Sequence, residues 1–209
     1  MGHYFINDEN LKSEIRVFSI NLFDKNFEFK TDNGVFSKGE LDFGTDLLIK
    51  TVINRNINGK VLDLGCGYGA IGIIINKVLN IPVDMIDINK RAIHISKINI
   101  KDNGCVMTNA FESDGYENVK TKYDYIISNP PIRVGKEKLY KLIKDSKNYL
   151  NKNGIIYLVI RREQGAKTFI RDFSDYYKIE ILDKKKGFYI ISLKSWDLYW
   201  LLLKNMLLI

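Results

Sequence analysis

The feature that most constrains this fold is a glycine-rich turn directly after a short apolar segment. The stretch VLDLGCGYGAIG, residues 61–72, carries glycines at positions 65, 67, 69 and 72. In the first turn of a doubly wound sheet the backbone must approach a ligand closely, and only glycine allows this without a clash from a Cβ atom. The stretch therefore predicts an open, mostly parallel α/β sheet with a ligand at this turn.

The sequence around this turn alternates strand-like and helix-like segments from residue 60 onwards. Such alternation is typical of βαβ units in a parallel sheet, followed here by a terminal hairpin with a basic loop. We expect strands over residues 60–64, 83–87, 110–114, 123–129 and 155–160, helices over 70–80, 89–104, 136–154 (closed by Gly154) and 163–173, and the hairpin over 177–194. The prediction is thus a doubly wound, mostly parallel α/β sheet of seven strands.

The residues before this core predict a β-rich lead-in, and those after it an apolar tail. Residues 17–37 alternate apolar and polar side chains, with Asp-Asn-Gly at 32–34 as a turn signal, and residues 43–55 indicate a helix with Thr45 as its N-cap. We expect one domain over 1–194, made of the lead-in 1–40 and the core 41–194. The tail, 195–209, is shorter than the ~18 apolar residues that a membrane-spanning helix needs, so we expect a helix packed on the domain, with a membrane-surface or partner contact as the alternative.

Composition indicates the cellular compartment and the kind of binding partner. The two cysteines, Cys66 and Cys105, show neither pair nor cluster spacing, and the N-terminus has no long apolar run. These features predict a reduced, cytoplasmic protein without a disulfide framework, a metal site or a secretory signal. The formal charge of +7 and the pI near 9.2 favour an acidic partner, above all a nucleic acid, unless the chain simply prefers lysine throughout.

Two acids flank the glycine turn and indicate what it binds. Asp63 precedes Gly65 by two residues, where a carboxylate can accept hydrogen bonds from turn amides or from a ligand ammonium group. Asp87 ends the next expected strand, where an acid can accept both hydroxyls of a ribose. The turn also fits the dinucleotide pattern G-x-G-x-x-G, so an NAD-dependent oxidoreductase remains an alternative. An anionic pyrophosphate gains little from Asp63, which favours a ligand with a positive group.

The same stretch resembles the first cofactor motif of the class I S-adenosylmethionine-dependent methyltransferases, which have a Rossmann-like sheet. The resemblance implies that the turn made of Gly65, Cys66, Gly67 and Gly69 lies against the methionine part of S-adenosyl-L-methionine. It implies that Asp87 binds the ribose. The stretch AFESDGYENV resembles the next cofactor motif, which implies that Asp114 takes the adenine amino group.

The most unusual stretch is Asn129-Pro130-Pro131, at the end of the fourth expected strand. Two prolines make a rigid, extended corner at the edge where open α/β sheets bind ligands. Such a corner can aim the Asn129 oxygen and a backbone carbonyl at the two N–H groups of an exocyclic amine. This arrangement orients the amine nitrogen toward a sulfonium methyl, so positioning and electrostatics supply the catalysis without a strong base.

Three longer stretches narrow the family. NPPIRVGK at 129–136, GVFSKGELDFGTDLL at 34–48 and IRREQGAKTF at 160–169 resemble the small-domain methyltransferases related to the bacterial enzyme that methylates the 2-amino group of a guanine in small-subunit ribosomal RNA. The resemblance covers roughly residues 3–194 and implies that Val35 to Ser37, Gly44 and Thr45 line the cofactor pocket. Better-known members carry a further N-terminal domain, so this chain resembles the single-domain form, and its apolar tail has no counterpart there.

The residue after the prolines bears on the substrate. Enzymes that methylate the 6-amino group of adenine, or a protein glutamine, typically place an aromatic residue there, whereas this chain has Ile132. This difference favours a guanine in structured RNA as the substrate. The guanine would have to be flipped out of its stack to reach the corner. Arg133 is available to bind a phosphate or a guanine edge. We expect an S-adenosylmethionine-dependent N-methyltransferase that acts on ribosomal RNA or the small (16S) ribosomal subunit, without a metal or a membrane. Adenine, protein glutamine, and an RNA-binding module without turnover remain alternatives.

Overall fold

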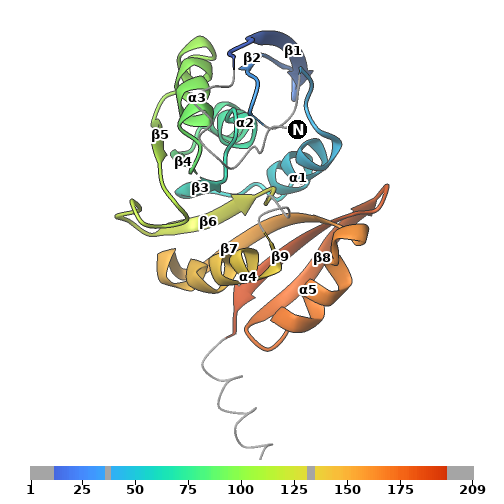
Figure 1. The fold of residues 1–209 in the computed structure, drawn as a ribbon. Helices are drawn as coiled ribbons and strands as arrows, with labels where there is room; N and C mark the ends of the chain where they lie inside the picture. The colour runs from blue at the N-terminus through green and yellow to red at the C-terminus, as the bar shows by residue number, and fades with distance from the viewer. Residues whose placement is uncertain (1–11, 36–38, 131–134, 197–209) are drawn as a thin grey trace, which may run out of the picture.

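The computed structural model describes residues 12–35, 39–130 and 135–196. Its centre is a seven-stranded sheet in the order β5-β4-β3-β6-β7-β9-β8, in which all neighbours are parallel except the two pairs that involve β9 (Figure 1). The predicted doubly wound, mostly parallel sheet is therefore confirmed. Its strands are β3 Val61–Leu64, β4 Val83–Asp87, β5 Thr108–Glu112, β6 Tyr123–Ser128, β7 Leu150–Arg161, β8 Tyr177–Lys185 and β9 Phe188–Ser195.

Helices cover both faces of this sheet (Figure 1). Successive residues of a strand point to opposite faces, so β3 sends Val61 into one apolar cluster and Leu62 and Leu64 into another. The first cluster lies under α1 Phe43–Ile53, α2 Ala70–Leu79 and α3 Lys90–Asp102, and the second lies under α4 Lys136–Asp145 and α5 Ala166–Phe173. No helix among the described residues is long and apolar enough to cross a membrane.

The lead-in forms a separate two-stranded hairpin of β1 Arg16–Leu22 and β2 Lys25–Thr31. Its turn lies at Phe23 and Asp24, both with positive φ, whereas the predicted turn at 32–34 only ends β2. The side-chain amides of Asn99 and Asn103 exchange hydrogen bonds of 2.7–3.2 Å with the backbone of β2. Two asparagines, one on α3 and one at its C-cap, thus occupy the place of a neighbouring strand and dock the hairpin.

The helix expected over 136–154 is shorter than predicted. It ends at Asp145 and continues as a single 3₁₀ turn, η2 Ser146–Tyr149, before β7 begins at Leu150. The buried hydroxyl of Ser146 contacts Tyr116, and Leu150 is buried in the second cluster beside β6. These contacts with distant elements end the helix early, so Gly154 lies inside β7 rather than at a helix end. A second 3₁₀ turn, η3 Arg162–Gln164, links β7 to α5.

Candidate active site at the ends of β3, β4 and β6

The candidate site lies where the sheet order reverses, between β3 and β6. From β3 the chain adds β4 and β5 on one side, and β6 and β7 on the other. The carboxyl ends of β3 and β6 therefore open a crevice, which is the usual ligand site of such sheets. The glycine turn follows β3, Asp87 ends β4, and Asn129 follows β6, so the structure brings these three predicted features to one edge.

The glycine turn is held open by backbone hydrogen bonds. The amides of Gly65 and Cys66 both donate to the carbonyl of Ile86 at 2.9 Å, and the amide of Gly67 donates to Oδ2 of Asp87 at 2.9 Å. Gly67 has a φ of 57°, and a Cβ added there would meet nothing within 4 Å. One side of the turn is thus free of other protein atoms, which is what a cradle for a ligand requires.

Two buried polar residues of α3 brace this turn and were not predicted. Ser96 donates its hydroxyl hydrogen to the carbonyl of Gly67 at 2.8 Å, and Asn99 donates to the carbonyl of Tyr68 at 2.8 Å. Both side chains are fully buried. The sequence contained a signal for this brace, because Ser96 and Asn99 are polar residues three positions apart on the apolar face of the expected helix.

The Cys66 side chain faces this brace, with its sulfur 3.7 Å from the Ser96 hydroxyl. Burial raises the pKa of the Cys66 thiol well above its usual value, with further contributions from the nearby carboxylates of Asp87 and Asp63. Burial thus favours the neutral thiol form of Cys66.

Asp63 is fully buried and accepts the amide hydrogen of Gly72 at 2.9 Å. That amide belongs to the first turn of α2, so Asp63 caps a helix instead of bonding the glycine turn as expected. Its other oxygen, Oδ1, has no hydrogen-bond partner among the described residues. Burial raises the pKa of Asp63 to about 7, against the opposing effect of the Gly72 amide, and the charge of Asp87 raises it further.

Gly72 has a packing role that explains why the turn also fits a dinucleotide pattern. A Cβ added at Gly72 would lie 2.3 Å from the sulfur and 2.6 Å from Cγ of Met85 on β4. The glycine therefore lets α2 pack closely on the sheet. Close helix–strand packing is needed in any fold of this kind, so this glycine carries no information about the ligand.

Asp87 and its neighbours tie the site to the lead-in. Its Oδ1 accepts the amide hydrogen of Asn89 at 2.9 Å, while Oδ2 holds the glycine turn. Burial raises the pKa of Asp87, and the amide hydrogen bonds partly offset this effect. Asn89 also caps α3 and donates to the carbonyl of Gly34 at 2.8 Å, so the segment before α1 is fixed beside the acid.

Asn129 has a fixed orientation. Its amide nitrogen donates to Oδ2 of Asp42 at 3.1 Å and to the hydroxyl oxygen of Thr45 at 2.9 Å. A carboxylate can only accept hydrogen bonds, so the nitrogen must face Asp42 and the oxygen Oδ1 must face the other way. The Asn129 oxygen is therefore the atom available to a substrate.

Asp42 is a further residue of the candidate site that the sequence interpretation missed. Its side chain accepts from the Thr45 amide at 2.9 Å and thereby caps α1, so the prediction of Thr45 as N-cap was wrong. Thr45 is instead the third helical residue, and its hydroxyl donates to the same carboxylate at 3.1 Å. The sequence did contain a signal for this cap, because Asp42 stands three residues before Thr45 at the start of the helix.

Of the remaining predicted site residues, some lie near the candidate site and others lie outside the described residues. Asp114 lies exposed after β5 and pairs with Lys138 at 3.1 Å, close to Asp87 because the Ser113 amide donates to the Asp87 carbonyl at 3.0 Å. Pro130 and Val35 are buried. The predicted residues Phe36, Ser37, Pro131, Ile132 and Arg133 lie outside the described part of the chain.

Gly44 has an explanation in packing. A Cβ at Gly44 would lie 2.6 Å from the Phe188 ring of β9. The glycine thus lets the start of α1 approach β9, next to the Asp42 side chain that holds Asn129.

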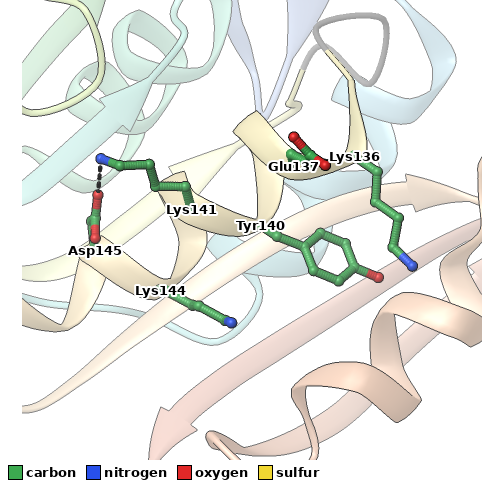
Figure 2. A pocket seen from close by; sticks show the side chains of 6 residues that line it. All are labelled: Lys136, Glu137, Tyr140, Lys141, Lys144 and Asp145. Carbon is green, nitrogen blue, oxygen red and sulfur yellow. Dashed lines mark hydrogen bonds and ion pairs between the residues drawn. The ribbon is translucent and has the colours of Figure 1, made fainter.

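A surface hollow elsewhere on the protein does not belong to this site. It runs along α4 and is lined by side chains of that helix alone: Lys136, Glu137, Tyr140, Lys141, Lys144 and Asp145 (Figure 2). Lys141 and Asp145, one turn apart on α4, form an ion pair of 2.9 Å (Figure 2). Within the described ranges, no group of three or more histidine, cysteine or acidic residues is arranged to hold a metal ion.

Comparison with known proteins identifies relatives of the chain. The family model described as the methyltransferase small domain matches residues 26–192. The uncharacterized protein YbxB of Bacillus subtilis is 36% identical over 197 residues, which cover 92% of this chain and 98% of YbxB. Ribosomal RNA small subunit methyltransferase C of Haemophilus influenzae is 37% identical over 168 residues, which cover 78% of this chain and 49% of the relative.

Solved structures share the fold. A Thermus thermophilus 16S ribosomal RNA N2-guanine methyltransferase, solved with S-adenosylmethionine and guanosine, superposes with a TM-score of 0.78 at 22% identity, over 89% of this chain and 52% of that protein. A Lactobacillus delbrueckii ribosomal protein L11 methylase superposes with a TM-score of 0.66 at 20% identity, over 75% of this chain. The chain spans about half the length of the small subunit methyltransferase C relatives that it matches.

Proposed function

The chain belongs to the methyltransferase small-domain family, and on that premise we propose that it methylates the exocyclic 2-amino group of a guanine in small-subunit ribosomal RNA. As a member of this family it is an S-adenosylmethionine-dependent methyltransferase. The observation that carries the finer proposal is the fixed amide of Asn129, whose oxygen is left for a substrate amine at the edge that also holds the glycine turn.

The residues at this edge fit S-adenosylmethionine. The open side of Gly67 gives the backbone close access to a ligand, and the unpartnered Oδ1 of buried Asp63 suits a positive group. We assign the ribose hydroxyls to Asp87, the methionine part to the turn 65–69 and the adenine amino group to Asp114. The bound cofactor supplies an electrophilic methyl group on a sulfonium centre.

The Asn-Pro-Pro corner positions the acceptor nitrogen. Asn129 Oδ1 accepts one N–H of the exocyclic amine, and a backbone carbonyl of the corner accepts the other. With both hydrogens held, the nitrogen lone pair turns away from the ring and toward the methyl group. The two oxygens would also stabilise the positive charge that develops on nitrogen as its bond to the methyl group forms and the sulfur–methyl bond breaks. The methylated nitrogen would then lose one of its two protons to water, so orientation and electrostatics supply most of the rate enhancement.

Guanine in ribosomal RNA is favoured over the other substrates by three facts. The position after the prolines holds Ile132, which offers no aromatic face for stacking, and the chain has a formal charge of +7. Several of its relatives are named ribosomal RNA small subunit methyltransferase C. The oxidoreductase alternative is disfavoured because the chain belongs to the methyltransferase small-domain family, whereas Gly72 does not discriminate between the two kinds of ligand.

The proposed substrate is tested by methyl transfer from labelled S-adenosylmethionine to small ribosomal subunits and, separately, to their protein-free RNA. Digestion to nucleosides and mass identification are expected to place the label in 2-N-methylguanosine. The Asn129→Ala protein, prepared identically, controls for contaminating methyltransferases. Label in methylated adenosine, or only in ribosomal protein, would overturn the guanine proposal.

Asp42 is expected to act on catalysis by holding Asn129, separately from its role as helix cap. Asp42→Ser keeps a good capping oxygen for α1 but removes the carboxylate that fixes the Asn129 amide, so we expect turnover to fall ~10-fold with little change in stability. Asp42→Ala removes both functions and is expected to cost about 1 kcal/mol of stability in addition. Turnover and thermal melting of the two variants separate the roles, and full turnover in Asp42→Ser would contradict the positioning role.

A further inference from the structure

Five cations gather at the edge of the sheet that carries the candidate site. β7 runs parallel to β6 and β8, and β9 runs antiparallel to β7 and β8, so the end of β7 and the tip of the β8–β9 hairpin lie at the same edge as the end of β6 (Figure 1). Asn129 follows β6 at this edge. All five side chains are exposed. We call this set the basic rim: Arg161, Arg162, Lys184, Lys185 and Lys186.

The backbone presents the basic rim rigidly. Arg161 on β7 and Lys185 on β8 both lie opposite Phe188 in the sheet, and the Arg162 amide donates to the carbonyl of Gly187 at 2.7 Å. The hairpin turn has positive φ at both Lys186 and Gly187, as a tight two-residue turn requires. The hairpin tip is thus tied to the end of β7.

Three of these cations lie over aromatic rings. The Arg161 guanidinium is 4.5 Å from the ring centre of Phe188, the Lys184 ammonium is 4.9 Å from that of Tyr189, and the Lys186 ammonium is 4.8 Å from that of Phe43. Contacts of this kind orient the long side chains while leaving their charge available.

The basic rim is connected to Asn129 through these rings. The rings of Phe43 and Phe188 lie 5.5 Å apart, and Phe43 follows Asp42, whose carboxylate holds the Asn129 amide. A Cβ added at Gly44 would lie 2.6 Å from the Phe188 ring and 3.3 Å from Oδ2 of Asp42, so the ring under Arg161 lies close to the carboxylate that holds Asn129.

None of the five cations forms an ion pair with a carboxylate within the described part of the chain, although Glu163 and Asp183 belong to the same segments. The lysines at 136, 138 and 141 differ, because they pair with Asp172, Asp114 and Asp145. The charge of the basic rim is thus uncompensated, whereas much of the charge on α4 is neutralised within the protein.

We propose that the basic rim binds the phosphate backbone of the substrate RNA next to the target nucleotide. The proposal rests on the proposed RNA substrate, and it adds the surface that holds the RNA. Exposed cations without an ion-pair partner, beside a site for a flipped base, suit the phosphates of the same strand, and phosphate contacts supply a large share of the affinity of RNA-binding proteins. The rim fixes the position of the RNA, while Asn129 acts on the base.

The test is binding of fluorescently labelled, in vitro transcribed 16S ribosomal RNA across a series of KCl concentrations. The variant Lys184→Gln/Lys185→Gln/Lys186→Gln is expected to weaken binding ~10-fold or more at 100 mM KCl. It should also reduce the slope of log K against log salt by about 2, because each lost phosphate contact on a single strand removes about 0.7. Thermal melting confirms that the variant is folded.

The matched control removes the same charge from the opposite edge of the sheet. Lys120, Lys122 and Lys152 are exposed and lie near the starts of β6 and β7, so their triple glutamine variant has the same net charge as the rim variant. It is expected to bind RNA within twofold of the unmodified protein. Equal weakening in both variants, or no weakening in either, would overturn the proposal.

A second pair of variants tests whether weaker RNA binding comes from lost charge or from lost contacts between cations and aromatic rings. Arg162 and Lys185 lie over no ring among the described residues, so Arg162→Gln/Lys185→Gln removes charge without loosening the hairpin, with Lys120→Gln/Lys122→Gln as its control. RNA binding by the unmodified protein, with methylation of neither that RNA nor small ribosomal subunits, would reject the proposed function but leave RNA binding by the rim intact. Methylation with equal KM in the rim and control variants would reject the rim alone.

Discussion

Replacing Asn129 by alanine is expected to lower methyl transfer ~100-fold or more while S-adenosylmethionine binds nearly as before, because one aimed polar group that acts in the transition state is lost. The amide makes two hydrogen bonds, to Asp42 and Thr45, and its free oxygen is the atom assigned to the substrate. The Asp42 carboxylate keeps its bonds to the Thr45 amide and hydroxyl in the variant, so α1 stays capped. Turnover should therefore change far more than stability.

The measurements are single-turnover methyl transfer, calorimetry with S-adenosylmethionine, and thermal melting. Asn151→Ala is the matched control, because Asn151 also donates its amide hydrogen to a carboxylate, that of Asp124 at 2.8 Å, but at the other end of β6. It is expected to retain full turnover. An Asn129→Ala protein with unchanged activity would remove the catalytic role assigned to Asn129.

Asp63→Asn is expected to change how stability depends on pH. Burial raises the pKa of Asp63 to about 7 in the folded protein, above its usual value of 3.8. The folded state then holds a proton that the unfolded state has lost, so this group makes stability fall as pH rises from about 4 to about 7. The total effect is at most about 4 kcal/mol, since each pKa unit corresponds to about 1.4 kcal/mol. Asparagine does not titrate and removes this contribution.

The test is the free energy of unfolding of both proteins at pH 5 and pH 8. All other groups are common to the two proteins, so the difference between them isolates Asp63. We expect Asp63→Asn to gain stability relative to the unmodified protein by up to about 3 kcal/mol between these pH values, because about two of the pKa units lie above pH 5. Parallel stability profiles would show that Asp63 does not titrate in this range.

The same substitution is expected to weaken S-adenosylmethionine binding. The unpartnered, buried Oδ1 of Asp63 is assigned to compensate the positive charge of the cofactor. Loss of a charged hydrogen bond costs roughly 1.5–3 kcal/mol, which corresponds to ~10-fold or more in affinity. Calorimetry with Asp84→Asn, which changes an acid at the opposite end of a neighbouring strand, provides the control. Equal affinities of the two variants would place Asp63 outside the cofactor site.

The sequence by itself determined the sheet and its ligand edge. Alternating strands and helices, the glycine turn after β3 and the acid that ends β4 are local patterns, because apolar periodicity and backbone conformation depend on neighbouring residues. The Asn-Pro-Pro corner is local in the same sense, since proline restricts the residue before it. These patterns were enough to predict the order of the strands along the chain and the edge on which Asp87 and Asn129 lie.

Only the tertiary structure decided what those residues touch. The amide of Asn129 is oriented by Asp42, 87 residues away, and the glycine turn is braced by Ser96 and Asn99 from another helix. The early end of α4 follows from burial of Leu150 beside β6, and the gathering of Arg161 with Lys186 follows from strand pairing. Such contacts join segments distant in sequence, and a local pattern does not specify them because they arise from packing across the sheet.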